Sequence, residues 1–160
     1  MAMDMFIKIG DIAGESRDSK HAGEIDVLAW SWGASNSGSA HVGGGAGAGK
    51  VNVQDLSLTK WIDKSTPDII LATCNGKHIP EAKLTVRKAG ENPLEYWVIT
   101  MTEVLISSYS TGGSGGEDRL TENVTLNFAK VKIEYKEQTA TGGVGATPSV
   151  GWDIAANVKL

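Results

Sequence analysis

The sequence predicts a mainly β protein: a compact antiparallel β-barrel of two sheets, with one short flanking α-helix and a long Gly-rich extended loop. Three observations support this fold class. Apolar and polar residues alternate over several stretches of the chain, which is typical of half-buried strands. The 160 residues include 20 glycines, well above the average share of ~7%, which implies many tight turns. The clearest helix start and stop signals surround residues 65–75. The length suits one domain over residues 1–160.

The stretch from residue 110 to 135 is the centre of the predicted barrel. It opens with an uncharged Gly/Ser turn, passes through the cluster Glu117, Asp118 and Arg119, and continues as a long strand. Its apolar residues first occupy the even positions of 124–128 and then the odd positions of 131–135. Such a shift either moves the side chains to the other face or marks a β-bulge, which bends a strand around the corner of a small barrel.

One helix interrupts the predicted strands. Ser65 is the expected N-cap, Pro67 suits the first turn, and Asn75-Gly76 is the expected left-handed end. A helix this short must dock on the sheet, so Cys74 is expected in the core. A loose surface loop is expected over 138–150. The expected strands are 5–9, 24–32, 51–58, 83–87, 94–109, 124–135 and 151–158.

Two of these strands, 24–32 and 94–109, are apolar on both faces. A strand of that kind is either central to a two-layer core or covered by a partner. We expect a partner in a chain of this length.

An extended loop over residues 35–49 contains almost only Ser, Gly and Ala. Connections in compact domains usually run ~4–6 residues, so a loop of this length is either functional or a flexible linker. We favour a flat arm that approaches another subunit closely, because it lacks charge, as interface cores do. Gly44, Gly49 and Lys50 imitate part of a phosphate-binding loop. However, Val51 stands where Ser or Thr would bind Mg²⁺, and a strand follows instead of a helix.

The composition disfavours several function classes. The net charge of −4 and the absence of Lys/Arg runs disfavour nucleic acid and anionic lipid as partners. The chain shows no signal-peptide pattern and no apolar run long enough to span a membrane. The single cysteine and the scattered His21, His41 and His78 form no metal-ligand or triad spacing. We therefore expect no cofactor, no metal and no enzymatic activity, and we interpret the histidines as solvated loop residues.

Four blocks of the sequence carry a family resemblance: residues 4–11, 21–33, 43–67 and 110–128. They resemble the haemolysin-coregulated protein (Hcp) family, which forms the inner tube of the bacterial type VI secretion system. The resemblance implies homohexameric rings that stack into a tube behind a VgrG-type spike, driven by a contractile sheath, with small effectors in the lumen. It also implies a cytoplasmic protein that leaves the cell without a cleaved signal peptide, to the outside or into a target cell.

Three sets of residues follow as candidate sites. Ser31 is expected to face the lumen, because it alternates with Trp30 and Trp32, which favour burial. Glu117, Asp118 and Arg119 are expected to form a salt-bridged turn or a subunit contact. The expected ring-stacking residues are Ser35, His41, Val42, Gly43, Gly44, Gly45, Gly47, Gly49 and Lys50. Two alternatives remain open: a phage-type tail tube protein, and a monomeric β-barrel that binds a small ligand along its Trp-rich strand.

Overall fold

A computed structural model describes residues 3–37, 50–90 and 93–160. Strands dominate these residues, and all pairings between strands are antiparallel. The mainly β fold class with one helix is therefore confirmed. The elements are β1 (Met3–Ile9), β2 (Ile25–Asp26), β3 (Ala29–Ser31), β4 (Ala34–Ser35), β5 (Asn52–Val53), β6 (Leu56–Trp61), α1 (Thr66–Asn75), β7 (Ile79–Lys88), β8 (Glu95–Thr111), β9 (Thr121–Tyr135), β10 (Ser149–Asp153) and β11 (Val158–Lys159).

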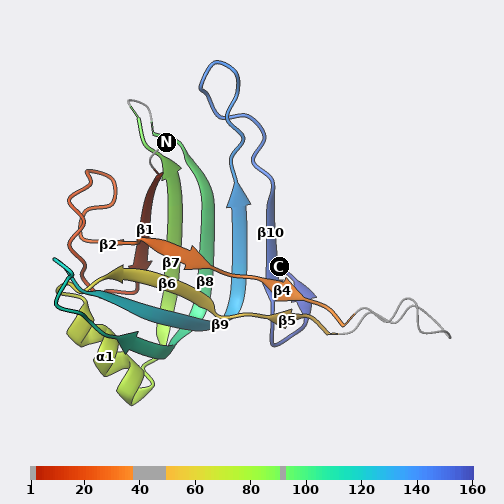
Figure 1. Cartoon of the computed structure of the whole chain (residues 1–160). Coiled ribbons are helices and arrows are strands. Elements are labelled where there is room, and N and C mark those ends of the chain that lie inside the picture. The colour runs from red at the N-terminus through yellow and green to blue at the C-terminus, as the bar shows by residue number, and fades with distance from the viewer. Residues whose placement is uncertain (1–2, 38–49, 91–92) are drawn as a thin grey trace.

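A nine-stranded sheet curls around the core. Its order is β11-β10-β9-β8-β7-β1-β2, and β6 joins β9 on one side and β3 on the other. Figure 1 shows β1, β7 and β8 running upright, with β6 and the first part of β9 crossing in front of them. Strands β4 and β5 form a separate two-stranded sheet that extends to one side, and α1 lies at the opposite end.

The segment 25–31 links β1, on one side of the curled sheet, to β6, on the other. Its first residues pair with β1 as β2, and its last residues pair with β6 as β3. Between them, the Val27 amide donates to the Met5 carbonyl and the Leu28 amide donates to the Thr59 carbonyl. The strand pairing is not continuous around the barrel, because this segment pairs with β1 through its first residues and with β6 through its last residues. The prediction of a single strand over 24–32 is therefore wrong, although parts of that stretch do form the strands β2 and β3.

The buried face changes at one level in three neighbouring strands. In β8 and β9 core side chains are buried two positions apart on each side of this level, and in all three strands the interval across it is three residues. The buried residues before and after the change are Ile79 and Ala82 in β7, Met101 and Val104 in β8, and Phe128 and Val131 in β9. The pairing register runs through this level without a shift. In β8 the backbone turns at Glu103, whose φ is 56°.

This change of face explains why β8 is apolar on both faces. Ile99 and Met101 are buried on one side of Glu103, and Val104 and Ile106 on the other. All four belong to the core of this same chain. The expectation that a partner covers the second face of this strand is therefore unnecessary for these residues.

Helix α1 docks on the barrel through Thr66, Ile69 and Ala72. Gly76 ends it with a φ of 64°, as predicted. Two details differ from the prediction. The Ser65 hydroxyl bonds to Asp63 and makes no cap hydrogen bond to the helix. Cys74 is exposed, because it lies on the side of the helix that faces away from the buried stripe, so its assignment to the core is wrong.

The connection between β9 and β10 carries its own hydrogen bonds. Gln138 and Val144 form an isolated bridge, and the Thr139 amide donates to the Gly143 carbonyl at 2.8 Å. Strand β10 begins at Ser149, two residues earlier than predicted.

Candidate functional site

The outer surface of β6 and of the first part of β9 carries small neutral polar side chains. In β6 and β9 the inward residues Leu56, Leu58, Val124 and Leu126 are buried, so the residues between them face outward. The strand registers align these outward residues into two rows across β3, β6, β9 and the end of β8. One row is Ser31, Ser57, Thr125 and Ser108, and the other is Ala29, Thr59, Asn123 and Ser110. We call these eight residues the polar face.

Hydrogen bonds between the strands hold much of the polar face in place. The Thr59 hydroxyl donates to the Asn123 side-chain oxygen at 2.8 Å. A register shift after Ile106 inserts an extra residue into β8, so that Ser107 and Ser108 both contact the Thr125 hydroxyl, at 2.7 and 2.6 Å. None of the eight side chains is titratable. The face can therefore form weak, reversible hydrogen bonds, but it contains no acid, base or activated nucleophile.

One carboxylate lies at the border of the polar face. Asp55 accepts hydrogen bonds from Ser107 at 2.6 Å and from the Asn127 amide at 2.9 Å. These two bonds use both carboxylate oxygens, and they orient the outward groups of β8 and β9.

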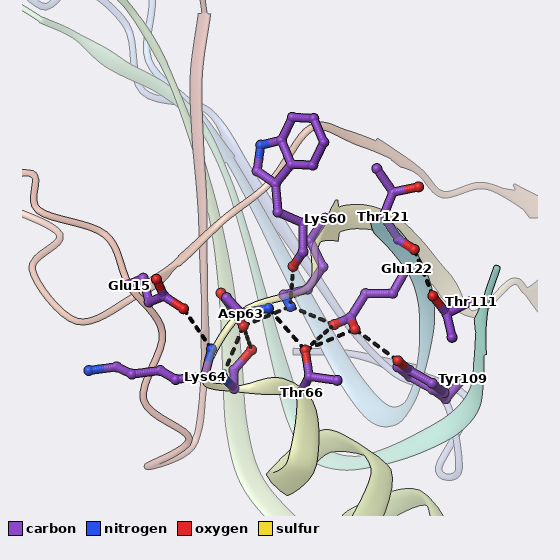
Figure 2. A network of polar contacts seen from close by, with 11 residues as sticks. Glu15, Lys60, Asp63, Lys64, Thr66, Tyr109, Thr111, Thr121 and Glu122 are labelled. Atoms are coloured by element: carbon purple, nitrogen blue, oxygen red, sulfur yellow. Dashed lines mark hydrogen bonds and ion pairs between the residues drawn. The ribbon is translucent and has the colours of Figure 1, made fainter. Parts of the chain in front are cut away.

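A buried polar network supports the polar face from beneath, next to the row that contains Thr59 and Asn123 (Figure 2). Lys60 and Glu122 are register partners in β6 and β9, and both are 0% exposed. The Lys60 Nζ contacts Glu122 at 2.5 Å, Asp63 at 3.0 Å and the Trp61 carbonyl at 2.8 Å. All three ammonium donor positions of Lys60 therefore have an acceptor.

The Glu122 carboxylate joins the helix to the sheet. It accepts hydrogen bonds from Thr66, at the start of α1, at 2.9 Å, and from the Tyr109 hydroxyl at 2.9 Å. Burial raises the pKa of Tyr109, and the bond to Glu122 and its charge add to that increase. The network thus fixes α1, β6, β8 and β9 to one another through fully paired groups, which is the condition under which buried charge is tolerated.

A second polar cluster fixes the loop between β1 and β2. His21 is 7% exposed, and its two ring nitrogens lie 2.8 Å from Glu24 and 2.7 Å from Glu95. Each ring nitrogen therefore lies within hydrogen-bond distance of one carboxylate. The ring also stacks on Phe6 at 4.5 Å. The interpretation of this histidine as a solvated loop residue is therefore wrong.

An arginine that also contacts the Phe6 ring anchors the same loop. The Arg87 guanidinium lies 5.0 Å from the Phe6 ring centroid and pairs with Asp18 and Asp4. Its hydrogen bond to Asp18 is the main cause that lowers the pKa of that carboxyl. Sequence reasoning missed both clusters, since Glu95 and Arg87 are far from the loop along the chain.

The predicted site residues lie in different parts of the molecule. Ser31 is exposed at the β3 end of the polar face, between the half-buried Trp30 and Trp32. Ser35 lies in β4, and Lys50 is exposed just before β5. The other predicted stacking residues fall outside the described ranges: His41, Val42, Gly43, Gly44, Gly45, Gly47 and Gly49.

The cluster at residues 117–119 lies in an exposed turn, in which the Glu117 amide donates to the Ser114 carbonyl. The ion pairs found among the described residues do not include this cluster. The Arg119 guanidinium instead lies 4.7 Å from the Trp61 ring centroid.

Two features are absent from the described part of the chain. It contains no helix of the length and apolar character that crossing a membrane requires. It also contains no group of three or more His, Cys, Asp or Glu side chains arranged to hold a metal ion.

Comparison with known proteins agrees with this architecture. The family described as "Type VI secretion system effector, Hcp" matches residues 6–135. Protein hcp1 of Pseudomonas aeruginosa is 67% identical over 161 residues, which cover 99% of both chains. A solved type six secretion system protein superposes with a TM-score of 0.93 at 31% identity, over 99% of this chain and 100% of the other. Hcp1 from Salmonella typhimurium gives 0.82 at 41% identity, over 100% of both chains. The chain therefore belongs to the Hcp family and is a tube subunit of the type VI secretion system.

Proposed function

We propose that the chain assembles head to tail into rings of six, and that the polar face lines their lumen. The observation that carries this proposal is the row Ser31, Ser57, Thr125 and Ser108, which crosses four strands on the outside of a well-packed barrel. A ring closed by rotation needs two different patches that meet between neighbours. The wall that faces the ring axis contacts water instead of a neighbour, so its side chains must be hydrophilic.

The chemistry of this face suits transport. The eight side chains are small and uncharged, so they neither narrow a channel nor hold a charged cargo by long-range attraction. Their hydroxyls are partly paired with one another, which limits the number of groups that could bind a passing protein. Small effector proteins would thus be carried in the lumen and released from it.

The remaining parts of the proposal concern assembly and export. The arm at residues 35–49 stacks one ring on the next, and the stacked tube carries a VgrG-type spike and is driven by a contractile sheath. Stacking contacts can be weak individually, because each ring repeats them around its axis. The protein is structural and not an enzyme. It is cytoplasmic until it leaves the cell without a cleaved signal peptide, to the outside or into a target cell.

Thiol labelling at Ser31 tests the lumen assignment. The exposed Cys74 is first replaced by Ser, so that a single cysteine remains in each variant. In a Ser31→Cys ring, a small maleimide is expected to react, whereas a maleimide carrying a bulky polymer is excluded from the lumen. Ser114→Cys, in the exposed turn before β9, is the matched control and should react with both reagents.

Two results of this labelling would contradict the proposal. If both reagents label Ser31→Cys rings equally, the residue lies on the outer wall. If neither reagent labels them although both label the monomer, a neighbouring subunit covers the polar face.

A further inference from the structure

A polar pocket lies on the outer surface of β1 and β7, beside the loop that joins β1 to β2 (Figure 1). Its volume is about 810 Å³, which is within the range of pockets that hold small molecules. Its lining includes Lys8 in β1, Lys20 in the loop and Lys83 in β7. We call this site the lysine pocket.

The strand register places two of these lysines directly opposite one another. Lys8 and Lys83 are partners in the antiparallel pairing of β1 with β7, and both side chains are exposed. Directly opposite residues have Cβ atoms about 4.5–5.5 Å apart, and like charges at such positions are destabilising. An anion bound between the two ammonium groups would replace this repulsion with attraction.

The three lysines have no ionic partner within the described residues. The ion pairs of that part of the chain do not include Lys8, Lys20 or Lys83. The chain has 19 acidic residues against 15 lysines and arginines. The lack of partners in the lysine pocket therefore does not reflect a shortage of carboxylates.

Most carboxylates that line the lysine pocket are paired with other groups. Glu24 and Glu95 lie 2.8 and 2.7 Å from the two ring nitrogens of His21. Asp11 lies 3.9 Å from the Nζ of Lys77. These carboxylates are therefore not the counter-ions of the three lysines.

The carboxylates around His21 are also held away from the opposed lysines. The His21 ring stacks on Phe6, which lies two positions before Lys8 on the same face of β1. Two positions along a strand span about 6.6–6.8 Å. Among the described lining residues, Glu81 is the one carboxylate without an ion pair. The lysine end of the pocket thus keeps a positive charge that an anion could neutralise.

The chemistry of this end suits a phosphate-bearing small molecule. Three ammonium groups match a ligand with two or more negative charges, and lysine binds phosphate as a point charge. The volume of about 810 Å³ leaves room for several phosphate groups or for an organic part beside them.

We propose that Lys8, Lys20 and Lys83 bind the phosphate groups of a small polyphosphate, either inorganic or part of a nucleotide. The inference does not rest on the proposed ring, because all three lysines belong to one subunit. A bound polyphosphate would link the loop at Lys20 to the sheet at Lys8 and Lys83. Binding to the folded chain would also raise its melting temperature.

Calorimetric titration with inorganic tripolyphosphate tests the site. Lys8→Gln/Lys83→Gln removes the two opposed charges, and it should weaken tripolyphosphate binding by at least about tenfold. Lys64→Gln/Lys159→Gln is the matched control, because it removes the same charge at two exposed lysines outside the pocket. The control should keep the wild-type affinity within about twofold, since salt screens distant exposed charges.

Glu81→Gln should change the affinity in the opposite direction. It removes the unpaired negative charge of the pocket, so tripolyphosphate should bind about two- to threefold more tightly. Acetylation of the wild type, read by mass spectrometry, gives an independent measurement. Saturating tripolyphosphate should protect Lys8 and Lys83 from the reagent and leave Lys64 as reactive as before.

A comparison of ATP with tripolyphosphate identifies the source of the phosphates. Binding of ATP at least tenfold tighter than tripolyphosphate would assign the site to a nucleotide, and equal binding would assign it to the phosphates alone.

Several results would overturn the lysine pocket as a polyphosphate site. They are an absence of binding at millimolar tripolyphosphate, an equal loss of affinity in the control variant, and unchanged affinity in Glu81→Gln. Tighter binding of a DNA oligonucleotide than of either small ligand would overturn the assignment to a small molecule. Each of these results leaves the proposed ring standing, because light scattering of the wild type tests the ring separately.

Discussion

The two halves of β9 differ in the position of their apolar residues and in the charge of their polar residues. In the first half, up to Phe128, the even-numbered residues are buried and the odd-numbered residues Asn123, Thr125 and Asn127 are polar and face outward. In the second half, the odd-numbered residues Val131 and Ile133 belong to the core or pack against it, and the even-numbered residues Lys130, Lys132 and Glu134 are charged. We call the first half the polar half, because it presents uncharged polar side chains outward.

The difference teaches that the change of face keeps apolar side chains in the core along a strand that turns. Because successive side chains alternate between faces, a strand of one constant pattern would present the same character along its whole length. The interval of three between Phe128 and Val131 reverses that character within a continuous strand. Neighbouring strands β7 and β8 change at the same level, so the whole sheet turns there.

Breaking the buried support of the polar half should have the largest effect on subunit stability. Lys60→Met leaves the Glu122 carboxylate buried without its cation, and we expect a loss of about 3–5 kcal/mol in the free energy of unfolding. Denaturant unfolding at fixed protein concentration measures it. The double variant Lys60→Met/Glu122→Leu should recover most of the loss, because it removes both charges. A double variant as unstable as the single one would show that the pair itself contributes the stability.

Truncating one core residue in each half sharpens the comparison. Leu126→Ala, in the polar half, should cost about 2–5 kcal/mol of subunit stability, because the side chain is fully buried. Ile133→Ala, in the second half, should cost less stability, since this side chain is only partly buried in the subunit. Denaturant unfolding measures both losses. Equal losses of stability would contradict the difference in packing between the halves.

The backbone turn at Glu103 should respond to side-chain shape. Its φ of 56° is unfavourable for any residue with a Cβ, and most unfavourable for a branched one. Glu103→Val should therefore destabilise the subunit by about 1–2 kcal/mol, whereas Glu103→Gly should differ from the wild type by less than about 1 kcal/mol. Thermal unfolding of the two variants measures the difference. Equal melting temperatures would contradict a requirement for this turn.

Tyr109 gives the smallest expected effect, at alkaline pH. Its pKa is raised in the folded protein, so its contribution to stability is full below the unfolded value of about 10 and is lost as the pH rises above it. Tyr109→Phe should remove this alkaline loss and lower stability at neutral pH by about 1 kcal/mol, through loss of the bond to Glu122. Unfolding curves between neutral pH and pH 11 measure both changes. If Tyr109→Phe loses as much stability at alkaline pH as the wild type does, other groups cause that loss.

Local patterns predicted the parts of the fold that depend on neighbours in sequence. The alternation over 124–128, the shift at 131 and the helix around Ile69 all follow from periodicity and capping signals, and the structure contains them. The outward position of Ser31 also agrees with its alternation with two tryptophans.

The rest depended on contacts between distant residues. Lys60 is fully buried because Glu122 faces it 62 positions later, and a lysine between Thr59 and Trp61 gives no local sign of that partner. His21 is buried partly because Glu95, at the start of β8, forms a hydrogen bond with its ring. The pocket lined by Trp32 and Trp152 was missed for a similar reason, since the two residues come together only when the curled sheet brings β10 beside the β4/β5 hairpin.

The most direct test of the polar face as the lumen wall is a cryo-electron microscopy reconstruction of the assembled wild-type protein. We predict a ring in which Ser31, Ser57, Thr125 and Ser108 face the axis. A ring in which the polar face is buried between subunits would contradict the account.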